Sequence, residues 1–246
     1  MSTRSKWVNG ILTFFNDTAF ETVKPLAPIV FYDDFLNTMA TIAAAGIEGW
    51  TRKTTGTPTT AALITANQHG GIITMALANT SEKEESGIYF GDALNFNLDK
   101  GPIFECRANV SVAPNNQVEL YFGLANAYVE GPIAEADAGP TVHAFFCFDG
   151  SLLPTIHTDD ASTDKDAIAT GVTCTTGAYN IFRIDCSVIT DVKFYIDGVG
   201  VGTGTTFDMS NSSNVMVQPF LIAHKENAGA GVGTLNVDYV RVWCGR

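Results

Sequence analysis

The stretch DVKFYIDGVGVGT, residues 191–203, decides the fold. Apolar and polar side chains alternate up to Asp197-Gly198, and the alternation resumes after this dipeptide. Alternation places successive side chains on opposite faces of a strand, and Asp-Gly is typical of tight hairpin turns. The stretch therefore predicts an antiparallel hairpin with one buried face, formed by Val192, Phe194 and Ile196.

Similar short runs recur along the chain with turn residues between them. Only residues 36–46 have the periodicity of a helix. Many short strands without alternating helices predict an all-β, two-sheet antiparallel sandwich. In it Phe182, Ile184 and Cys186 should form one inner row, with Val237, Tyr239 and Val242 near another. The strand-like runs are 70–78, 87–91, 103–112, 117–125, 142–148, 179–188, 191–197, 215–225 and 234–243.

The 246 residues are 46% hydrophobic and 16% charged, which suits a single sandwich domain over residues 30–246. Residues 1–29 differ, since an apolar cluster leads into Pro25 and Pro28, which favour an extended path. We interpret this segment as an N-terminal arm that docks on a partner chain, the alternative being that it packs on its own sandwich. The proposed partner-binding side chains are Trp7, Ile11, Leu12, Phe14, Phe15 and Phe20.

The formal net charge of −12 opposes binding to nucleic acids and to anionic membranes. No run is long enough for a membrane span, and Asn9-Gly10 interrupts the only apolar segment that resembles a signal peptide. We therefore expect a chain made in the host cytoplasm and not secreted by a signal peptide. The five cysteines form no C-x-x-C pair and are expected to be reduced and buried.

The order of several motifs resembles the concanavalin A-like lectin/glucanase superfamily, which includes laminin-G-like domains. The resemblance covers about residues 30–246 and implies a jelly-roll sandwich. Its motifs are FYDDFLN at 31–37 with Trp50 soon after, FECRANVSV at 104–112, VELYFGLAN at 118–126, YNIFRIDCS at 179–187, DVKFYIDG at 191–198 and LNVDYVRVW at 235–243.

The glycosidases of this superfamily carry E-x-D-x-x-E or E-x-D-x-E on one strand, where alternation brings the carboxylates to one face. Here the only Glu-x-Asp is Glu135-Ala136-Asp137, between Pro132 and Pro140 in a predicted loop. We therefore expect no catalytic residues and no enzyme. Glu105 and Glu119 could face each other across a concave sheet, but we favour solvent-facing positions for both.

Other polar segments have two interpretations. The four carboxylates of Asp159, Asp160, Asp164 and Asp166 are a candidate Ca²⁺ loop, although we favour a solvated acidic loop and no cofactor. Residues 81–87, SEKEESG, are expected to form a solvated turn. His69, His143, His157 and His224 share no ligand spacing and are expected to be structural or exposed. Candidate glycan-contacting aromatics are Trp50, Tyr89, Tyr121 and Tyr128.

An acidic, reduced sandwich with an apolar arm resembles structural proteins of tailed phages. The first hypothesis is a non-enzymatic virion protein that decorates or cements a capsid, or forms a head fibre, on the virion surface. Its partners would be other virion proteins such as the major capsid protein, and a homo-oligomer, with a trimer favoured, would let weak arm contacts act together. The alternatives are a glycan-binding, lectin-like module for surface polysaccharide and a glycoside hydrolase with a degenerate motif.

Deleting residues 1–29 tests the role of the arm. We expect the truncated chain to remain folded and to lose attachment to its partner, because the apolar side chains that would dock are removed. Native mass measurements should show that the full-length chain forms a defined oligomer or self-associates. The truncated chain should be monodisperse. Two monomers would contradict an assembly role for the arm.

Overall fold

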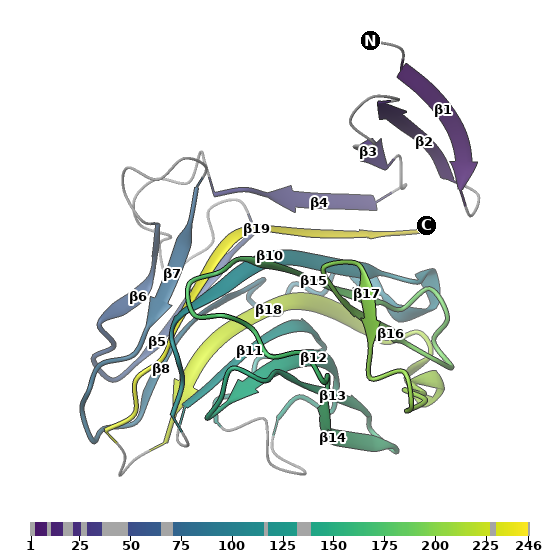
Figure 1. The fold of residues 1–246 in the computed structure, drawn as a ribbon. Coiled ribbons are helices and arrows are strands. Elements are labelled where there is room, and N and C mark those ends of the chain that lie inside the picture. Colours follow the sequence, from purple (N-terminus) through teal and green to yellow (C-terminus); the bar gives the residue numbers. More distant parts are fainter. Residues whose placement is uncertain are drawn as a thin grey trace.

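A computed structural model confirms an all-β sandwich of two antiparallel sheets (Figure 1). It describes residues 3–8, 11–16, 22–25, 29–35, 49–64, 71–115, 118–131, 139–226 and 230–245, with only the backbone described for 3–8, 11–16, 22–25 and 61–64. The helix predicted at 36–46 lies outside these ranges. No helix within them has the length and apolar character that crossing a membrane requires.

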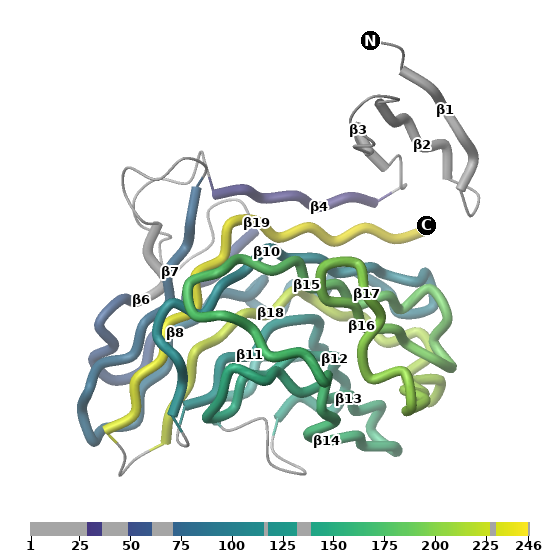
Figure 2. Tube along the Cα trace, in the orientation of Figure 1, coloured from purple at the N-terminus to yellow at the C-terminus, as the bar shows by residue number. Residues whose placement is uncertain are grey.

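One sheet, called the β10 sheet, has the order β17-β16-β15-β10-β19-β7-β6, and β4 also pairs with β19. Figure 2 shows β4 running beside the C-terminal part of β19. The strands are β4 (Ile29–Asp33), β6 (Thr60–Ile64), β7 (Ile73–Ala76), β10 (Ile103–Val112), β15 (Asn180–Asp185), β16 (Lys193–Ile196), β17 (Val199–Val201) and β19 (Thr234–Cys244).

The other sheet, called the β11 sheet, has the order β14-β13-β12-β11-β18-β8-β5, and β9 also pairs with β18. Two short 3₁₀ turns, η1 (Leu98–Lys100) and η2 (Ser210–Ser212), lie between strands. The strands are β5 (Thr51–Thr55), β8 (Glu84–Tyr89), β9 (Phe96–Asn97), β11 (Val118–Ala125), β12 (Val142–Asp149), β13 (Thr155–Asp160), β14 (Asp164–Ala169) and β18 (Met216–Lys225).

The predicted arm contains three strands that pair only with one another, in the order β1-β2-β3. They are β1 (Thr3–Val8), β2 (Ile11–Asn16) and β3 (Thr22–Pro25), so this segment is a small antiparallel sheet rather than a single extended run. The side chains proposed for partner binding lie outside the described residues, as does the whole of Phe20. Their docking role stays a prediction.

The hairpin at 191–203 forms as predicted. Val192, Phe194 and Ile196 are buried in the core between the two sheets. Asp197 and Gly198 both have positive φ, 49° and 79°, which is the requirement of a type I′ turn. The inner row Phe182, Ile184 and Cys186 is also buried, which confirms the register read from the alternation.

The alternation of β19 slips once, and the predicted position of Tyr239 is wrong for that reason. Arg107 of β10 lies opposite Tyr239, whereas the next residue, Ala108, lies opposite Val237. Asp238 is thus the extra residue of a β-bulge, which reverses the facing of the residues after it. Val237 and Val242 remain in the core, while the Tyr239 hydroxyl donates to Glu105 on the outer face, at 2.8 Å.

All five cysteines are free and buried, as predicted. They lie on strands or loops of both sheets. Burial raises the pKa of each thiol, that of Cys174 to about 11. The thiols are therefore protonated near neutral pH and act as small apolar side chains.

The turn predicted over residues 81–87 is wrong, because the chain enters β8 at Glu84 and buries it. Glu84 and Lys225 are both fully buried, with 3.4 Å between Glu84 Oε1 and Lys225 Nζ. The Lys225 ammonium also donates to the carbonyl oxygens of Ala78 and Thr80, at 2.5 and 2.7 Å. The Ala78 N–H and the Thr80 hydroxyl donate to the Glu84 carboxylate. Each buried charge thus has hydrogen bonds that replace its hydration.

The acidic loop predicted around residue 160 is a hairpin, β13–β14, in which Asp159, Asp160 and Asp166 have separate hydrogen-bond partners. Asp160 is buried and accepts from the N–H groups of Ser162 and Thr163 and from Asn211. Asp159 accepts from the N–H of Ala161, at 2.7 Å. In the described part of the chain no three His, Cys, Asp or Glu side chains converge as a metal site.

His157 of this hairpin is buried and held as a neutral ring. Its Nε2 lies 2.9 Å from the Thr155 hydroxyl, and its Nδ1 lies 3.4 Å from the N–H of Ala167 and 3.2 Å from Asp166. Burial lowers its pKa to about 4, against the opposing pull of Asp164 and Asp149.

Removing the buried ammonium should destabilise the protein strongly. Lys225→Met leaves Glu84 buried without its cation, which costs about 3–5 kcal/mol of unfolding free energy. Lys225→Met combined with Glu84→Gln should recover part of this loss, and Lys193→Met, at an exposed ion pair, should cost under about 1 kcal/mol. Urea unfolding measures all three, and equal stability of Lys225→Met and the wild type would refute the pairing.

His157 should make the protein less stable in mild acid. Its pKa is about 4 in the fold and about 6.5 in the unfolded chain, so the unfolded chain binds more protons between these values. The contribution of His157 to the free energy of unfolding should therefore be fully present above pH 6.5 and fall toward pH 4, by roughly 3 kcal/mol at most. Thermal unfolding from pH 7 to 4 should show a shallower slope for His157→Gln. An unchanged slope would assign the effect to other groups.

Candidate functional site

The outer face of the β11 sheet, turned away from the β10 sheet, carries a second hydrophobic cluster separate from the core. Figure 1 shows β18 as an arc across this sheet. Side chains from β8, β11, β12 and β18 contribute to the cluster because alternate residues of each strand face outward. We call its aromatic members the tyrosine cluster: Tyr89, Tyr121, Tyr128, Phe145 and Phe220.

The rings of the tyrosine cluster are in direct contact. Tyr89 and Tyr128 stack with centroids 4.9 Å apart, and Tyr121 stacks on Phe220 at 5.8 Å. Tyr121 and Phe220 are fully buried, whereas Tyr89 and Tyr128 are only partly covered. The pair Tyr89–Tyr128 therefore presents aromatic surface above a rigid aromatic base.

Three of the four predicted glycan-contacting aromatics thus lie together, and the fourth does not. Trp50 is fully buried in the core between the sheets. It packs edge-on against Phe31 and Phe90, and its Nε1–H donates to Asp33 Oδ2 at 2.8 Å. Trp50 is a structural residue, and its proposed contact with a glycan is withdrawn.

A row of ionisable side chains crosses the same face beside the tyrosine cluster. In the strand register Glu85 of β8 lies opposite His224 of β18, which lies opposite Glu119 of β11. His224 Nδ1 is 3.2 Å from Glu85 Oε2, and His224 Nε2 is 3.2 Å from Glu226 Oε1. The imidazole of His224 thus lies between two carboxylates, one on each ring nitrogen.

The tyrosine cluster and the ionic row are joined by Tyr128, whose hydroxyl donates to Glu85 Oε1. Burial and the Glu85 charge raise the pKa of Tyr128, and burial raises that of Tyr121. Both phenols therefore stay protonated and donate hydrogen bonds. Tyr121 donates to the carbonyl oxygen of Gly131, at 3.3 Å.

Residues 126–131, which we call the cover segment, cross the outer face after β11. The Tyr128 N–H donates to Asp92, and Asp92 also accepts from Gln218 at 2.8 Å. Glu130 pairs with Lys53 of β5 and with Lys83, at 3.5 and 3.6 Å. These contacts hold Tyr128 over the sheet and surround the tyrosine cluster with polar groups.

Glu105 and Glu119 do not face each other, because they lie on different sheets. Glu105 is buried on the outer face of the β10 sheet, where it accepts from Arg183 and Arg241, at 2.6 and 2.7 Å. Burial alone would raise its pKa, but Arg241 and Arg183 outweigh it and keep the pKa below the usual value. Glu135 and Asp137 lie outside the described residues.

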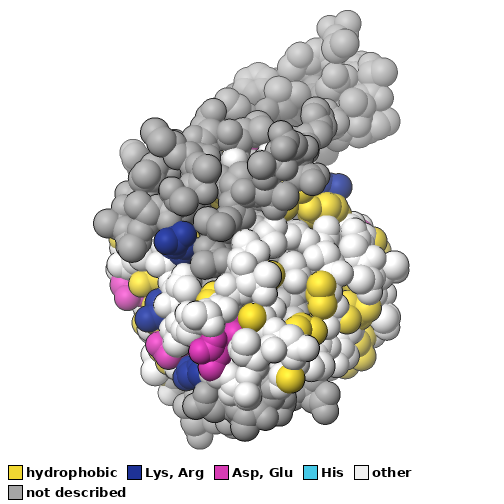
Figure 3. Space-filling view, turned by 90° about the vertical axis from the view of Figure 1, so that its left-hand side faces the viewer, with side chains coloured by type: hydrophobic (Ala, Val, Ile, Leu, Met, Phe, Trp, Pro, Cys, Tyr) yellow, Lys and Arg dark blue, Asp and Glu magenta, His cyan; other side chains and the backbone are white. Residues whose placement is uncertain are grey.

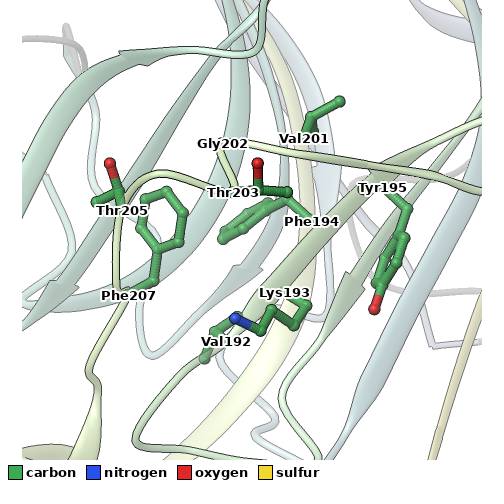
Figure 4. Close-up of a pocket in the computed structure, with 10 residues that line it drawn as sticks. Val192, Lys193, Phe194, Tyr195, Val201, Gly202, Thr203, Thr205 and Phe207 are labelled. Atoms are coloured by element: carbon green, nitrogen blue, oxygen red, sulfur yellow. The ribbon is translucent and has the colours of Figure 1, made fainter.

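A cleft of about 240 Å³ lies elsewhere, between β16 and residues 200–207 (Figure 4). Phe194 and Phe207 form its apolar wall, with ring centroids 5.0 Å apart. Lys193 and Tyr195 are the titratable residues that line it, and no carboxylate or imidazole does. The cleft thus lacks the acid–base groups found on the β11 sheet, which remains the candidate site.

The chain matches no protein-family model and no curated protein. Solved structures resemble it in fold. One is described with the endo-acting O-glycanases with which members of the human gut microbiota initiate mucin breakdown: 11% identity, TM-score 0.58, covering 88% of this chain and 99% of that one. Another is the Emp47p carbohydrate recognition domain, with 11% identity and a TM-score of 0.55; the match covers 87% of this chain and 94% of that one. A third is SCLam, a non-specific endo-β-1,3(4)-glucanase from family GH16, with 13% identity and a TM-score of 0.50; the match covers 88% of this chain and 90% of that one.

These likenesses contradict the prediction that the chain is not an enzyme. Two of the three structures are described as glycanases, so the fold links this chain to enzymes as well as to lectins. The missing E-x-D-x-x-E motif argues against one catalytic arrangement only. At these identities the likeness concerns the fold alone: the chain shares a jelly-roll sandwich with the Emp47p domain and with SCLam.

Proposed function

We propose that this protein binds a glycan on the outer face of the β11 sheet, by stacking on the tyrosine cluster. The observation that carries the proposal is the partly exposed Tyr89–Tyr128 pair, stacked over buried aromatics and edged by hydrogen-bonding groups. Aromatic faces pack well against the apolar C–H faces of sugar rings. A few polar groups around an apolar base are the usual composition of a small-molecule site.

The groups around the cluster suit sugar hydroxyls. Carboxylates accept hydrogen bonds, and Glu226, Glu130 and Asp92 surround the tyrosine pair. Lys53 lies over the ring of Tyr128, 5.1 Å from its centroid, and can donate. The similar structures described as a carbohydrate recognition domain and as glycanases support a ligand of this class.

Cleavage of the bound glycan is a second candidate, for which the row Glu85–His224–Glu119 supplies two carboxylates; all three side chains are buried, so a ligand would have to displace Tyr128 to reach Glu85. Two carboxylates separated by one intervening strand have Cα atoms roughly 10 Å apart, and glycoside hydrolysis uses a carboxylic acid and a carboxylate on either side of the bond. The virion role stays a prediction from the sequence. None of the structures reported above is described as a virion protein.

Tyr89→Ala should weaken glycan binding about threefold to tenfold, because a stacked aromatic contributes roughly 0.5–1.5 kcal/mol. A glycan array should first identify a ligand, and calorimetry should then compare the variants. Tyr179→Ala is the matched control, since Tyr179 is partly buried beside Arg107 on the β10 sheet.

An array without any ligand, or equal losses in both variants, would refute the proposed site. Mass spectrometry of the bound oligosaccharide after incubation decides between binding and cleavage.

A further inference from the structure

We propose that the site selects uncharged glycans and rejects those that carry carboxylate or sulfate groups. This inference rests on the proposed function and specifies its ligand class. It comes from the balance of charges and of hydrogen-bond acceptors around the tyrosine cluster.

Acidic side chains predominate on this face. They come from three strands and from the loops beside them: Glu85, Asp92, Glu119, Glu130, Asp149 and Glu226. Unlike a site for an anionic ligand, the described part of this face has no cation that lacks a carboxylate partner. The imidazole of His224 lies between Glu85 and Glu226.

Both lysines beside the cluster are already engaged. Lys53 Nζ is 3.5 Å from Glu130, and Lys83 Nζ is 3.6 Å from Glu130 and 3.2 Å from Glu226. Figure 3, which views the side of the molecule that carries β5 to β8, shows acidic and basic side chains following one another along one edge of the described surface. An anionic sugar would have to displace a carboxylate from one of these lysines.

His143 adds a further acceptor to the same face. It stacks on Phe145 of the tyrosine cluster, with ring centroids 4.8 Å apart, and is 4% exposed. Its Nδ1–H donates to the carbonyl oxygen of Pro140 at 2.8 Å, which leaves Nε2 as an acceptor without a partner among the described residues. Burial lowers the pKa of this ring, which keeps Nε2 unprotonated.

A face lined by acceptors matches a ligand rich in donors. Each hydroxyl of a neutral sugar can donate to a carboxylate or to an imidazole nitrogen. A uronate brings more acceptors and a like charge, and like charges placed together across an interface are strongly disfavoured. The discrimination should weaken as salt screens the exposed part of this field.

The test compares hexasaccharides of glucose and of mannose with a hexasaccharide of alginate uronates, by calorimetry at low and physiological salt. We expect at least one neutral ligand to bind tenfold or more tightly than the uronate, with a smaller ratio at higher salt. Uronate binding that equals or exceeds neutral binding overturns the selectivity and leaves glycan binding intact. Failure of every hexasaccharide to bind overturns the proposed function and the inference with it.

A charge variant assigns the discrimination to named residues. Glu130→Gln combined with Glu226→Gln removes the two negative charges that pair with Lys53 and Lys83, so the uronate affinity should rise at least threefold relative to the neutral ligand. The side chains of Glu130 and Glu226 are 37% and 45% exposed, which protects the fold. The control is Asp99→Asn, an exposed carboxylate on η1. An unchanged ratio, or the same rise in the control, would contradict the assignment.

Discussion

The β11 sheet depends on two adjacent side-chain contacts between β8 and β18: a buried ion pair and a buried carboxylate–imidazole contact. Glu84 lies opposite Lys225 and Glu85 lies opposite His224, so two consecutive carboxylates meet a histidine and a lysine in register. Successive residues of a strand face opposite sides of the sheet. Glu84 and Lys225 therefore contact the loop at 78–80 on one side, whereas Glu85 and His224 lie on the outer face. A slip of one residue in either direction would separate one of the two carboxylates from a basic partner, which favours the observed alignment of these strands.

This pairing is needed because the centre of the sheet is covered on both faces. Every residue of β11 is buried, as are nearly all those of β12 and β18. One face packs in the core, and the other carries the tyrosine cluster under the cover segment. Polar groups in such a sheet must find partners within the protein, as the buried Glu84, Glu85 and His224 do.

Alternation and turn residues predicted most of the fold, from the hairpin at 191–203 to the strands at 103–112 and 234–243. The contacts of Glu84 with Lys225 and of Glu85 with His224 were missed, because SEKEESG has the composition of a solvated turn and its partners lie some 140 residues away. The dipeptides Glu84-Glu85 and His224-Lys225 were the available signal. The bulge at Asp238 has no such signature, and it displaced Tyr239. Aromatic type alone could not separate Trp50 in the core from the three tyrosines on the outer face.

The buried thiols allow local opening of the fold to be measured by chemical labelling. A thiol-modifying reagent reacts with the thiolate, and burial keeps all five sulfurs protonated and out of reach in the closed fold. Labelling then requires local opening. Cys147 lies under the outer face, whereas Cys106 and Cys186 lie in the core, so the order in which they are modified would trace which layer of the sandwich loosens first.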